Sequence, residues 1–343
     1  MRDSPAETRL CPKRSLRTGD TIMKRLIASL GLLTLLAGHS AQAQEWPARQ
    51  PIKVIVTLSP GSATDVLARI AFEQVSKQIG QAIVIENRAG AGQRIGTTAA
   101  ARAEPDGYTL LVNSSTHTLF SAMFTTLNFD VMRDFVALAP LASIPTVMVT
   151  PPARGWTSLA AFVAQAKAKP GSINYGSGGI GNSTHLAAER VRMAAGFEGV
   201  HVPFAGAPEA INEVVAGRVD FYFSPVPPAL SLIREGMLKP LAVTSARRSS
   251  VLPDVPTTVE AGFPNSGYEF WVGTFAPART PRPIVDRLAR ELSTALLTPA
   301  VREKYAALGA DPMPMGAHDF DEYIRREIEL NVAIVRAVGI KQE

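Results

Sequence analysis

Four short stretches of glycine, serine and other small polar residues hold the groups best suited to bind a ligand. They are Ser59 to Asp65, Gly90 to Gly96, Asn113 to His117, and Gly176 to Ser183 followed by Thr184 and His185. Backbone N–H groups and hydroxyls in such stretches donate hydrogen bonds, so together they can hold an anion without a permanent counter-charge. Ser62 and Asp65 have the spacing of a capping box, which leaves N–H groups free at the positive end of a helix. The stretches predict an anion site, although an ordinary strand-to-helix turn also explains the first of them.

An alternation of strand and helix patterns must position these stretches. Strands are expected over 51–56, 82–86 and 108–112, with helices over 65–79 and 95–103. A second series has strands over 145–150, 172–175, 200–203, 219–223 and 238–244, and helices over 158–168, 183–195, 208–216 and 227–235. A last strand over 268–276 and helices over 281–297, 299–308 and 317–337 are expected to pack on the first lobe. Such alternation predicts two α/β lobes whose ligand binds at the carboxyl ends of the strands, in a cleft.

The first 43 residues have the pattern of a secretory signal peptide. A basic start at Met23-Lys24-Arg25 precedes an apolar run from Leu26 to Ala37, and Ala41 and Ala43 form an A-x-A cleavage site. We expect cleavage after Ala43, translation from Met23 rather than Met1, and a periplasmic location.

The mature chain is nearly neutral and has no cysteine. Of 35 basic and 30 acidic residues, seven and three lie in residues 1–43, which leaves 28 and 27. The pI of 9.4 is therefore no argument for nucleic-acid binding. The single cysteine, Cys11, lies upstream of the cleavage site, so disulfides and thiol chemistry are excluded from the mature protein.

Enzymatic and cofactor-binding motifs are weak. Gly176 to Gly181 formally matches G-x-G-x-x-G, but it lies deep in an exported chain, where a nicotinamide cofactor is not expected. No serine has the G-x-S-x-G surroundings of a nucleophile elbow, and Asn182-Ser183 is more simply a helix cap. The mature histidines, His117, His185, His201 and His318, lack metal-ligand spacing. We expect no cofactor, no metal and no catalysis.

Several aromatic residues could line a pocket, although aromatic side chains in strands usually belong to the core. They are Phe204, Trp271 and the run from Phe221 to Phe223. Of these, only Phe204 is kept as a candidate for ligand contact.

The ordered motifs resemble those of the Bug family, the substrate-binding proteins of tripartite tricarboxylate transporters. The motifs are Ser59-Pro-Gly with Asp65 and Arg69, Glu86-Asn-Arg with Gly90 to Gly96, Pro105-Asp-Gly-Tyr-Thr109, Tyr175 to Ser183 with His185-Leu186, Val202-Pro203 with Gly206, Leu241 to Ser245, and Pro253 to Thr257. The resemblance covers residues 51–341.

The resemblance implies a two-lobe periplasmic binding protein of type II, with a hinge and an interlobe cleft. It implies a first lobe of residues 44–142 and 262–343 and a second lobe of 143–261. It further implies a monomer that captures a small carboxylate and delivers it to the membrane permease subunits. A ligand-sensing partner of a membrane receptor and a periplasmic hydrolase are the alternatives.

The candidate ligand-binding residues combine the loops with the family pattern. They are Ser59, Gly61, Ser62, Asp65, Gly92, Gln93, Arg94, Ser114, Ser115, Ser177, Gly179, Gly181, Asn182, Ser183, His185, Phe204 and Asp220. Ser62, Gln93 and Arg94 stand where the family commonly has smaller residues, and Phe204 stands where it often has tyrosine. We hypothesise that Arg94 binds a second carboxylate of the ligand, with a solvated arginine as the alternative.

Overall fold

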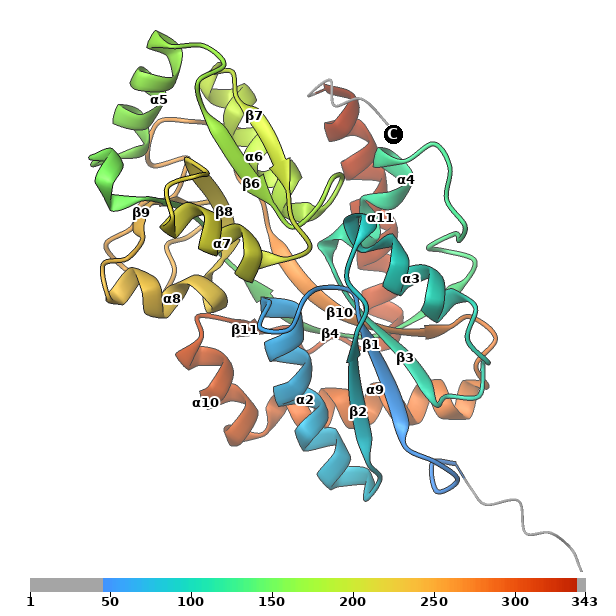
Figure 1. The fold of residues 1–343 in the computed structure, drawn as a ribbon. Helices are drawn as coiled ribbons and strands as arrows, with labels where there is room; N and C mark the ends of the chain where they lie inside the picture. The colour runs from blue at the N-terminus through green and yellow to red at the C-terminus, as the bar shows by residue number, and fades with distance from the viewer. Residues whose placement is uncertain (1–45, 338–343) are drawn as a thin grey trace, which may run out of the picture. The chain divides into compact units, whose positions relative to one another are not determined.

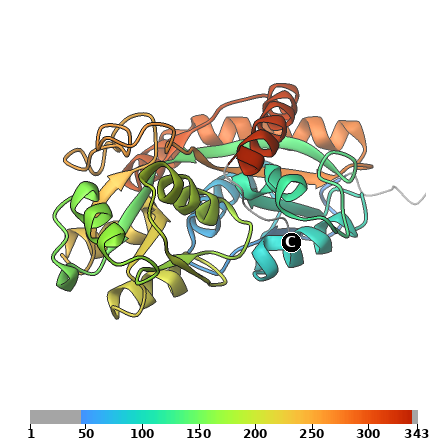
Figure 2. The same ribbon diagram turned by 90° about the horizontal axis from the view of Figure 1, so that it is seen from above.

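Two β-sheets organise residues 46–337, the part of the chain that the computed structural model describes. The start site, signal peptide and cleavage site expected within residues 1–43 lie outside it. Each sheet carries its own helices, and in Figure 2 the strands of residues 146–243, in green and yellow, form a group separate from the other strands. The expected α/β fold with two lobes is confirmed.

The sheet of the first lobe mixes parallel and antiparallel strands. Its order is β11 (Asp311–Pro312), β4 (Phe135–Ile144), β10 (Phe270–Pro277), β3 (Thr109–Ser114), β1 (Ile52–Val56) and β2 (Ile83–Asn87). Strand β1 pairs in parallel with β2 and β3, while β10 runs antiparallel between β3 and β4. The carboxyl ends of β1, β2 and β3 therefore meet at one edge of the sheet (Figure 1).

The sheet of the second lobe is smaller. Its order is β7 (Val200–Pro203), β6 (Asn174–Ser177), β8 (Phe221–Pro225), β5 (Thr146–Thr150) and β9 (Lys239–Val243). Strand β6 pairs in parallel with β7 and β8, so the loop after β6 leaves the same edge as the ends of those two strands.

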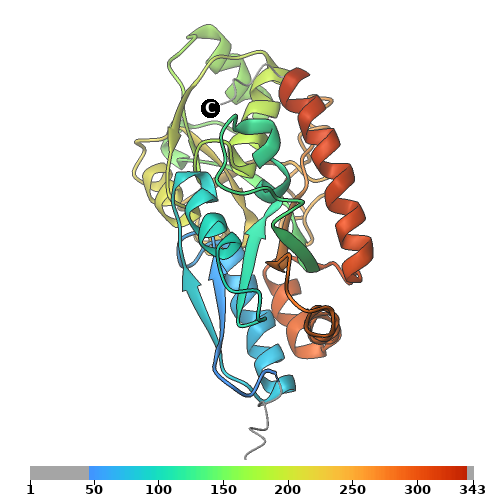
Figure 3. The same ribbon diagram turned by 90° about the vertical axis from the view of Figure 1, so that its right-hand side faces the viewer.

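Helices cover both sheets. Those of the first lobe are α2 (Ala63–Ile79), α3 (Arg94–Ala101), α4 (Phe120–Met123), α9 (Arg282–Leu297), α10 (Pro299–Ala307) and α11 (Ala317–Ala337). Those of the second are α5 (Leu159–Ala168), α6 (Ser183–Ala195), α7 (Ala207–Val215) and α8 (Val226–Arg234). Short 3₁₀ turns are η1 (Ala91–Gln93), η2 (Ser115–Thr118) and η3 (Pro152–Arg154). Figures 2 and 3 show α3 and α11 on opposite sides of the first sheet. None of the helices within residues 46–337 is long and apolar enough to cross a membrane.

Buried aliphatic strands hold each lobe together. Ile52, Val54 and Val56 of β1 are fully buried, as are Leu110 and Val112 of β3. Burial of one such side chain stabilises the fold by roughly 1.5–3 kcal/mol. These rigid strands fix the positions of the loops that follow them.

Strand β4 is not among the elements expected from the sequence. Pro140 lies inside it, and a proline in a strand interior argues against a central strand because it cannot donate to the ladder. In the structure, Pro140 lies opposite Gly273 at a register shift, where Val272 pairs with Ala142 and Leu141 is skipped. A β-bulge therefore accommodates the proline.

The chain crosses between the lobes at two neighbouring places. Pro145 joins β4 to β5, and Thr244 leaves β9 towards β10. The Thr244 N–H donates to the Thr146 carbonyl at 2.9 Å, and the Tyr268 N–H donates to the Thr244 carbonyl at 2.9 Å. These paired crossings form the hinge.

Candidate ligand-binding site

The glycine-rich loops of the two lobes touch each other. A Cβ atom on Gly92, in the loop after β2, would lie 2.2 Å from the carbonyl oxygen of Ile180, in the loop after β6. A Cβ on Gly179 would lie 3.0 Å from the Gly92 Cα. The candidates Gly92 and Gly179 are thus brought together, and the absence of side chains is what lets the two backbones approach this closely.

The start of α2 presents free N–H groups to the second lobe. Ser62 is the N-cap, and its hydroxyl accepts a hydrogen bond from the Asp65 N–H at 3.3 Å. The Asp65 carboxylate accepts from the Gly61 N–H at 2.9 Å and from Arg69. Burial disfavours the Asp65 charge, but these hydrogen bonds outweigh it and lower the pKa of the carboxyl. Asp65 therefore stabilises the loop that precedes α2.

Behind these loops lies a buried polar network that ends at the second lobe. Gln93 Oε1 accepts from the hydroxyls of Thr57 at 2.8 Å and Ser114 at 3.1 Å. Its Nε2 donates to Thr116 Oγ1 at 2.6 Å. Thr116 Oγ1 in turn accepts from the Ser183 N–H at 3.0 Å and lies 3.2 Å from Ser183 Oγ. Thr116, which the sequence pattern did not single out, thus connects the lobes.

The start of α6 is built like the start of α2. Asn182 is the N-cap, and its Oδ1 accepts from the His185 N–H at 3.0 Å and the Thr184 hydroxyl at 2.9 Å. The Ser177 hydroxyl accepts from the Gly179 N–H at 3.1 Å. The second-lobe loop is therefore held rigid by its own polar side chains, and the Ser183 N–H donates across to Thr116 of the first lobe.

The starts of α2 and α6 border one small cavity between the lobes. Its volume is about 10 Å³, room for no more than a single water. It is lined by Leu58, Ser62, Ala63, Thr64, Gly178, Asn182, Ser183, Thr184, Ala207, Tyr222, Pro225 and Phe270. Thr64 Oγ1 and Tyr222 OH are fully buried there without a hydrogen-bond partner of ordinary geometry. Buried polar groups are normally paired, so these two hydroxyls are available to form hydrogen bonds with a polar ligand.

The comparison with known families identifies the architecture. Residues 67–340 match the model of the "Tripartite tricarboxylate transporter family receptor". The chain belongs to this family. The family consists of periplasmic solute-binding proteins.

Relatives of this receptor family share the whole fold. The chain is 36% identical to Protein BugT of Bordetella pertussis, over 93% of this chain and 99% of BugT. MatC from Rhodopseudomonas palustris, solved with bound malate, is 30% identical with a TM-score of 0.81, over 84% of this chain and 99% of MatC. An R. palustris protein solved with adipate is 28% identical with a TM-score of 0.84, over 87% of this chain and 100% of that protein.

Two histidines lie beneath the second-lobe loop of this receptor-family protein. His185 stacks on His201 with ring centroids 3.9 Å apart, and His185 Nδ1 accepts from the Gly181 N–H at 3.2 Å. Burial lowers the pKa of both, that of His201 to about 3 with a further contribution from His185. The rings are therefore neutral at pH 7. They support the loop and supply no positive charge for an anion.

The Ser177–His201 pair lacks the features of a nucleophile and its base. Ser177 Oγ lies 2.6 Å from His201 Nε2, but no carboxylate in the described part of the chain orients the imidazole. The Ser183 hydroxyl meets Thr116 rather than a histidine.

Two candidate residues, Arg94 and Asp220, have local partners apart from the cavity lining. The Arg94 guanidinium lies over the Phe124 ring, 4.1 Å from its centroid, and its Nε donates to the Ala91 carbonyl. Asp220 accepts from the Asn174 N–H at 2.7 Å and pairs with Arg154, at the opposite end of β6 from Ser177. The structure thus gives Arg94 and Asp220 local partners.

Two further candidates lie close to the loops but have structural contacts. The Phe204 N–H donates to the Ser177 carbonyl at 2.9 Å, and its half-buried ring lies near Gly176. Ser115 Oγ accepts from the Tyr268 hydroxyl at 2.9 Å, on the hinge side.

The sequence pattern missed Thr64 and Glu209, and it named Tyr222 as a possible pocket residue but set it aside as core. Thr64 lies two residues after the predicted cap Ser62, so its place in the first turn of α2 was a usable signal. Tyr222 belongs to a strand run that reads as core, and Glu209 to the first turn of α7, where an acid is common. Only the tertiary packing brings these three residues towards one cavity.

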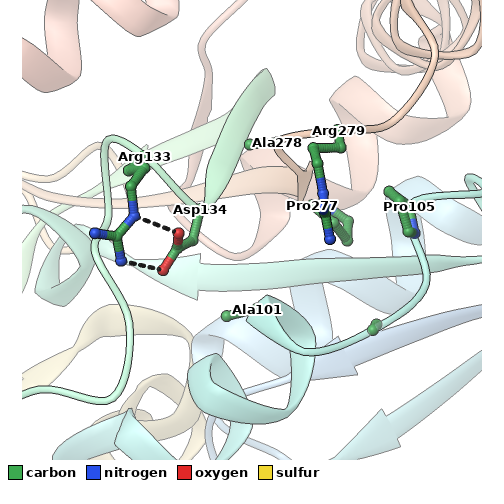
Figure 4. Close-up of a pocket in the computed structure, with 8 residues that line it drawn as sticks. Ala101, Pro105, Arg133, Asp134, Pro277, Ala278 and Arg279 are labelled. Atoms are coloured by element: carbon green, nitrogen blue, oxygen red, sulfur yellow. Dashed lines mark hydrogen bonds and ion pairs between the residues drawn. The ribbon is translucent and has the colours of Figure 1, made fainter.

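A larger depression lies elsewhere on the first lobe. Figure 4 shows it between Ala101, Pro105, Pro277 and the Arg133–Asp134 ion pair, and its volume is about 380 Å³. None of the predicted loops reaches it. Within residues 46–337, no group of three or more His, Cys, Asp or Glu side chains is placed to hold a metal ion.

Proposed function

We propose that this protein captures a small carboxylate between its lobes in the periplasm and delivers it to the membrane subunits of a tripartite tricarboxylate-type transporter. The observation that carries the proposal is the meeting of two helix starts at one cavity. Helices α2 and α6 come from different lobes, and both begin at that cavity. The malate and adipate bound by two related proteins support the ligand class.

The N–H groups at the start of α2 suit a carboxylate. Within residues 46–337, those of Ala63 and Thr64 donate to no protein acceptor. Such groups at a positive helix end stabilise an anion, and each hydrogen bond to a charged partner contributes roughly 1.5–3 kcal/mol. The helix starts replace the permanent cation that this cavity lacks.

Binding requires the lobes to move. A carboxylate does not fit a cavity of about 10 Å³, so the ligand enters only when the hinge opens. When the lobes close on a ligand, contacts through the ligand replace the direct hydrogen bond between Thr116 and Ser183. A ligand that stabilises the closed form in this way shifts the lobe equilibrium, which a permease can recognise.

The carboxylate site is tested with Ala63→Pro. Proline at the first helical position removes one free N–H while the helix remains intact. The mature chain, residues 44–343, is titrated calorimetrically with succinate, malate and adipate. We expect at least one to bind and Ala63→Pro to weaken it by about tenfold or more. Ala160→Pro, in the first turn of α5 on the exposed surface, is the matched control. If neither these acids nor monocarboxylates of the same length bind to the wild type, the carboxylate assignment is wrong.

Export and delivery need separate tests. Mass spectrometry of the protein from a periplasmic extract is expected to show a first residue of Gln44, and a peptide from before Met23 would contradict the proposed start. Uptake of the labelled ligand by cells is expected to stop when the gene is deleted. Normal uptake with loss of a transcriptional response would instead favour a ligand-sensing partner of a membrane receptor.

A further inference from the structure

We propose that the cleft holds an ammonium subsite formed by Glu209, Tyr222 and Thr64, so that the solute is a small amino carboxylate. The inference rests on the proposed function, because the carboxylate of that solute binds at the helix starts. It adds a second, positively charged recognition point to the same ligand.

Three buried polar atoms without partners carry this inference. They are Thr64 Oγ1, Tyr222 OH and Glu209 Oε2. Thr64 comes from the first lobe, whereas Tyr222 and Glu209 come from β8 and α7 of the second. A polar group that is left buried and unpaired destabilises the fold. Three of them around one cleft are best explained by a ligand group that satisfies all three.

Several contacts place Glu209 beside this cavity. Ala207, which lines the cavity, precedes Glu209 by two residues in the first turn of α7. A Cβ on Gly206 would lie 3.0 Å from Ser59 Cβ and 3.2 Å from Glu209 Oε2, so this oxygen and the first-lobe loop lie on either side of the same point beside Gly206.

The charge of Glu209 also affects the pKa of the Tyr222 phenol. Burial is the main cause that raises the pKa of Tyr222 above the ordinary value. The Thr184 hydroxyl lowers this pKa, whereas the Glu209 carboxylate raises it further. Glu209 and Tyr222 therefore act on the same small volume.

No protein cation neutralises Glu209 within the described part of the chain. Arg218, on the same side of the lobe, pairs with Glu213, and Arg69 pairs with Asp65. The positive end of α7 favours a carboxylate at this position, but it leaves Oε2 without a hydrogen bond. The buried Oε2 atom lacks a hydrogen-bond donor, so a ligand ammonium that reaches it gains a charge-assisted hydrogen bond.

An ammonium group matches this set of atoms. It has three N–H donors and a positive charge, and the subsite offers two hydroxyl oxygens and one carboxylate oxygen as acceptors. A second carboxylate in the same place would face Glu209 with a like charge. The subsite therefore selects against simple dicarboxylates of the same length.

Matched ligands test the selection. The wild-type mature protein is titrated with succinate and 4-aminobutyrate, adipate and 6-aminohexanoate, and malate and aspartate, in which an ammonium-bearing group replaces a carboxylate or a hydroxyl. We expect an amino compound to bind at least tenfold more tightly than its partner in at least one pair. Binding of the acids without any such preference would overturn the ammonium subsite and leave the proposed function standing. Silence towards all six would overturn both.

Variants test the assignment to these residues. Glu209→Gln keeps the shape of the side chain and removes its charge, and we expect it to abolish the preference for the amino compound. Tyr222→Phe is expected to reduce that preference by up to about tenfold. Glu213→Gln, on the same helix but paired with Arg218, is the matched control. Because the readout is a ratio of two affinities in one protein, partial loss of stability does not imitate the effect. An unchanged ratio in Glu209→Gln would overturn the role of Glu209.

Discussion

The Thr116 hydroxyl accepts a hydrogen bond from the Ser183 N–H at 3.0 Å, across the boundary between the two lobes. The same oxygen accepts from Gln93 Nε2 at 2.6 Å. One side chain therefore connects the buried network of the first lobe to the start of α6, and it does so where the ligand is expected.

Thr116→Val removes this connection while keeping the shape of the side chain. We expect the variant to lose about 1–3 kcal/mol of unfolding free energy, because Gln93 Nε2 and the Ser183 N–H lose their acceptor. Urea denaturation of the mature chain measures the loss. Thr126→Val, at an exposed position, is the control and should change the unfolding free energy by less than about 0.5 kcal/mol. Equal effects of the two variants would show that the interlobe bond contributes nothing to stability.

Gly92→Ala is expected to hold the lobes apart. Gly92 has φ +59°, and a Cβ there would lie 2.2 Å from the Ile180 carbonyl oxygen of the other lobe. Gly80→Ala is a matched control, because Gly80 has φ +66° with nothing within 4 Å of its Cβ. Both variants have the same unfavourable backbone conformation, so their difference isolates the interlobe clash. Small-angle X-ray scattering should show a larger radius of gyration for Gly92→Ala alone, and identical radii would contradict this account.

His117 is expected to make the protein sensitive to acid. Burial lowers its pKa from 6.5 to about 3, and its ring stacks on Phe275 with centroids 3.9 Å apart. The unfolded chain therefore binds a proton that the folded chain does not, so stability is lost as the pH falls from 6.5 towards 3. His117→Phe should reduce the slope of unfolding free energy in this window by up to about 1.4 kcal/mol per pH unit. His318→Gln, on the surface of α11, should leave the slope unchanged, and an unchanged slope in His117→Phe would contradict the prediction.

Glu327 is expected to act in the opposite direction. Burial is the main cause that raises its pKa from 4.5 to about 7, although the Thr118 hydroxyl and Trp271 indole donate to the carboxyl at 2.8 Å. The folded chain binds the extra proton, so this contribution is present below pH 4.5 and is lost as the pH rises through 7. The stability difference between wild type and Glu327→Gln should therefore fall by up to about 1.4 kcal/mol per pH unit across this window.

Urea unfolding of wild type and Glu327→Gln at several pH values between 4 and 8 measures this fall. Glu329→Gln, at an exposed position of the same helix, is the control. A pH-independent difference for Glu327→Gln would show that the carboxyl keeps an ordinary pKa.

Arg94→Ala is expected to leave ligand affinity within about twofold of wild type. The Arg94 guanidinium is engaged by the Phe124 ring and the Ala91 carbonyl, and it does not line the cavity. Calorimetric titration with the acid that binds best measures the affinity. A tenfold loss would restore the hypothesis that Arg94 binds a second carboxylate.

Short-range chemistry made much of the architecture predictable. Ser62 and Asn182 were expected at helix starts because a cap involves only residues within three positions of each other, and both cap their helices in the structure. The alternation of strands and helices predicted two α/β lobes for the same reason. Strand β4 was missed because its Pro140 is tolerated only through a bulge opposite Gly273, a partner 133 positions away along the chain.

The site itself depends on contacts between distant segments. The pairing of Thr116 with Ser183, and the proposed approach of Thr64, Tyr222 and Glu209 to one cleft, join residues from different sheets and helices. No local pattern encodes such proximity, since a tyrosine in a strand and a glutamate in a first helical turn are ordinary in themselves. Likewise, Asp220 and Arg94 have plausible residue types for a site, but the packing gives them other partners. The order of residues along the chain is sufficient to predict the loops, whereas packing of the two lobes determines which side chains in and around those loops share a cavity.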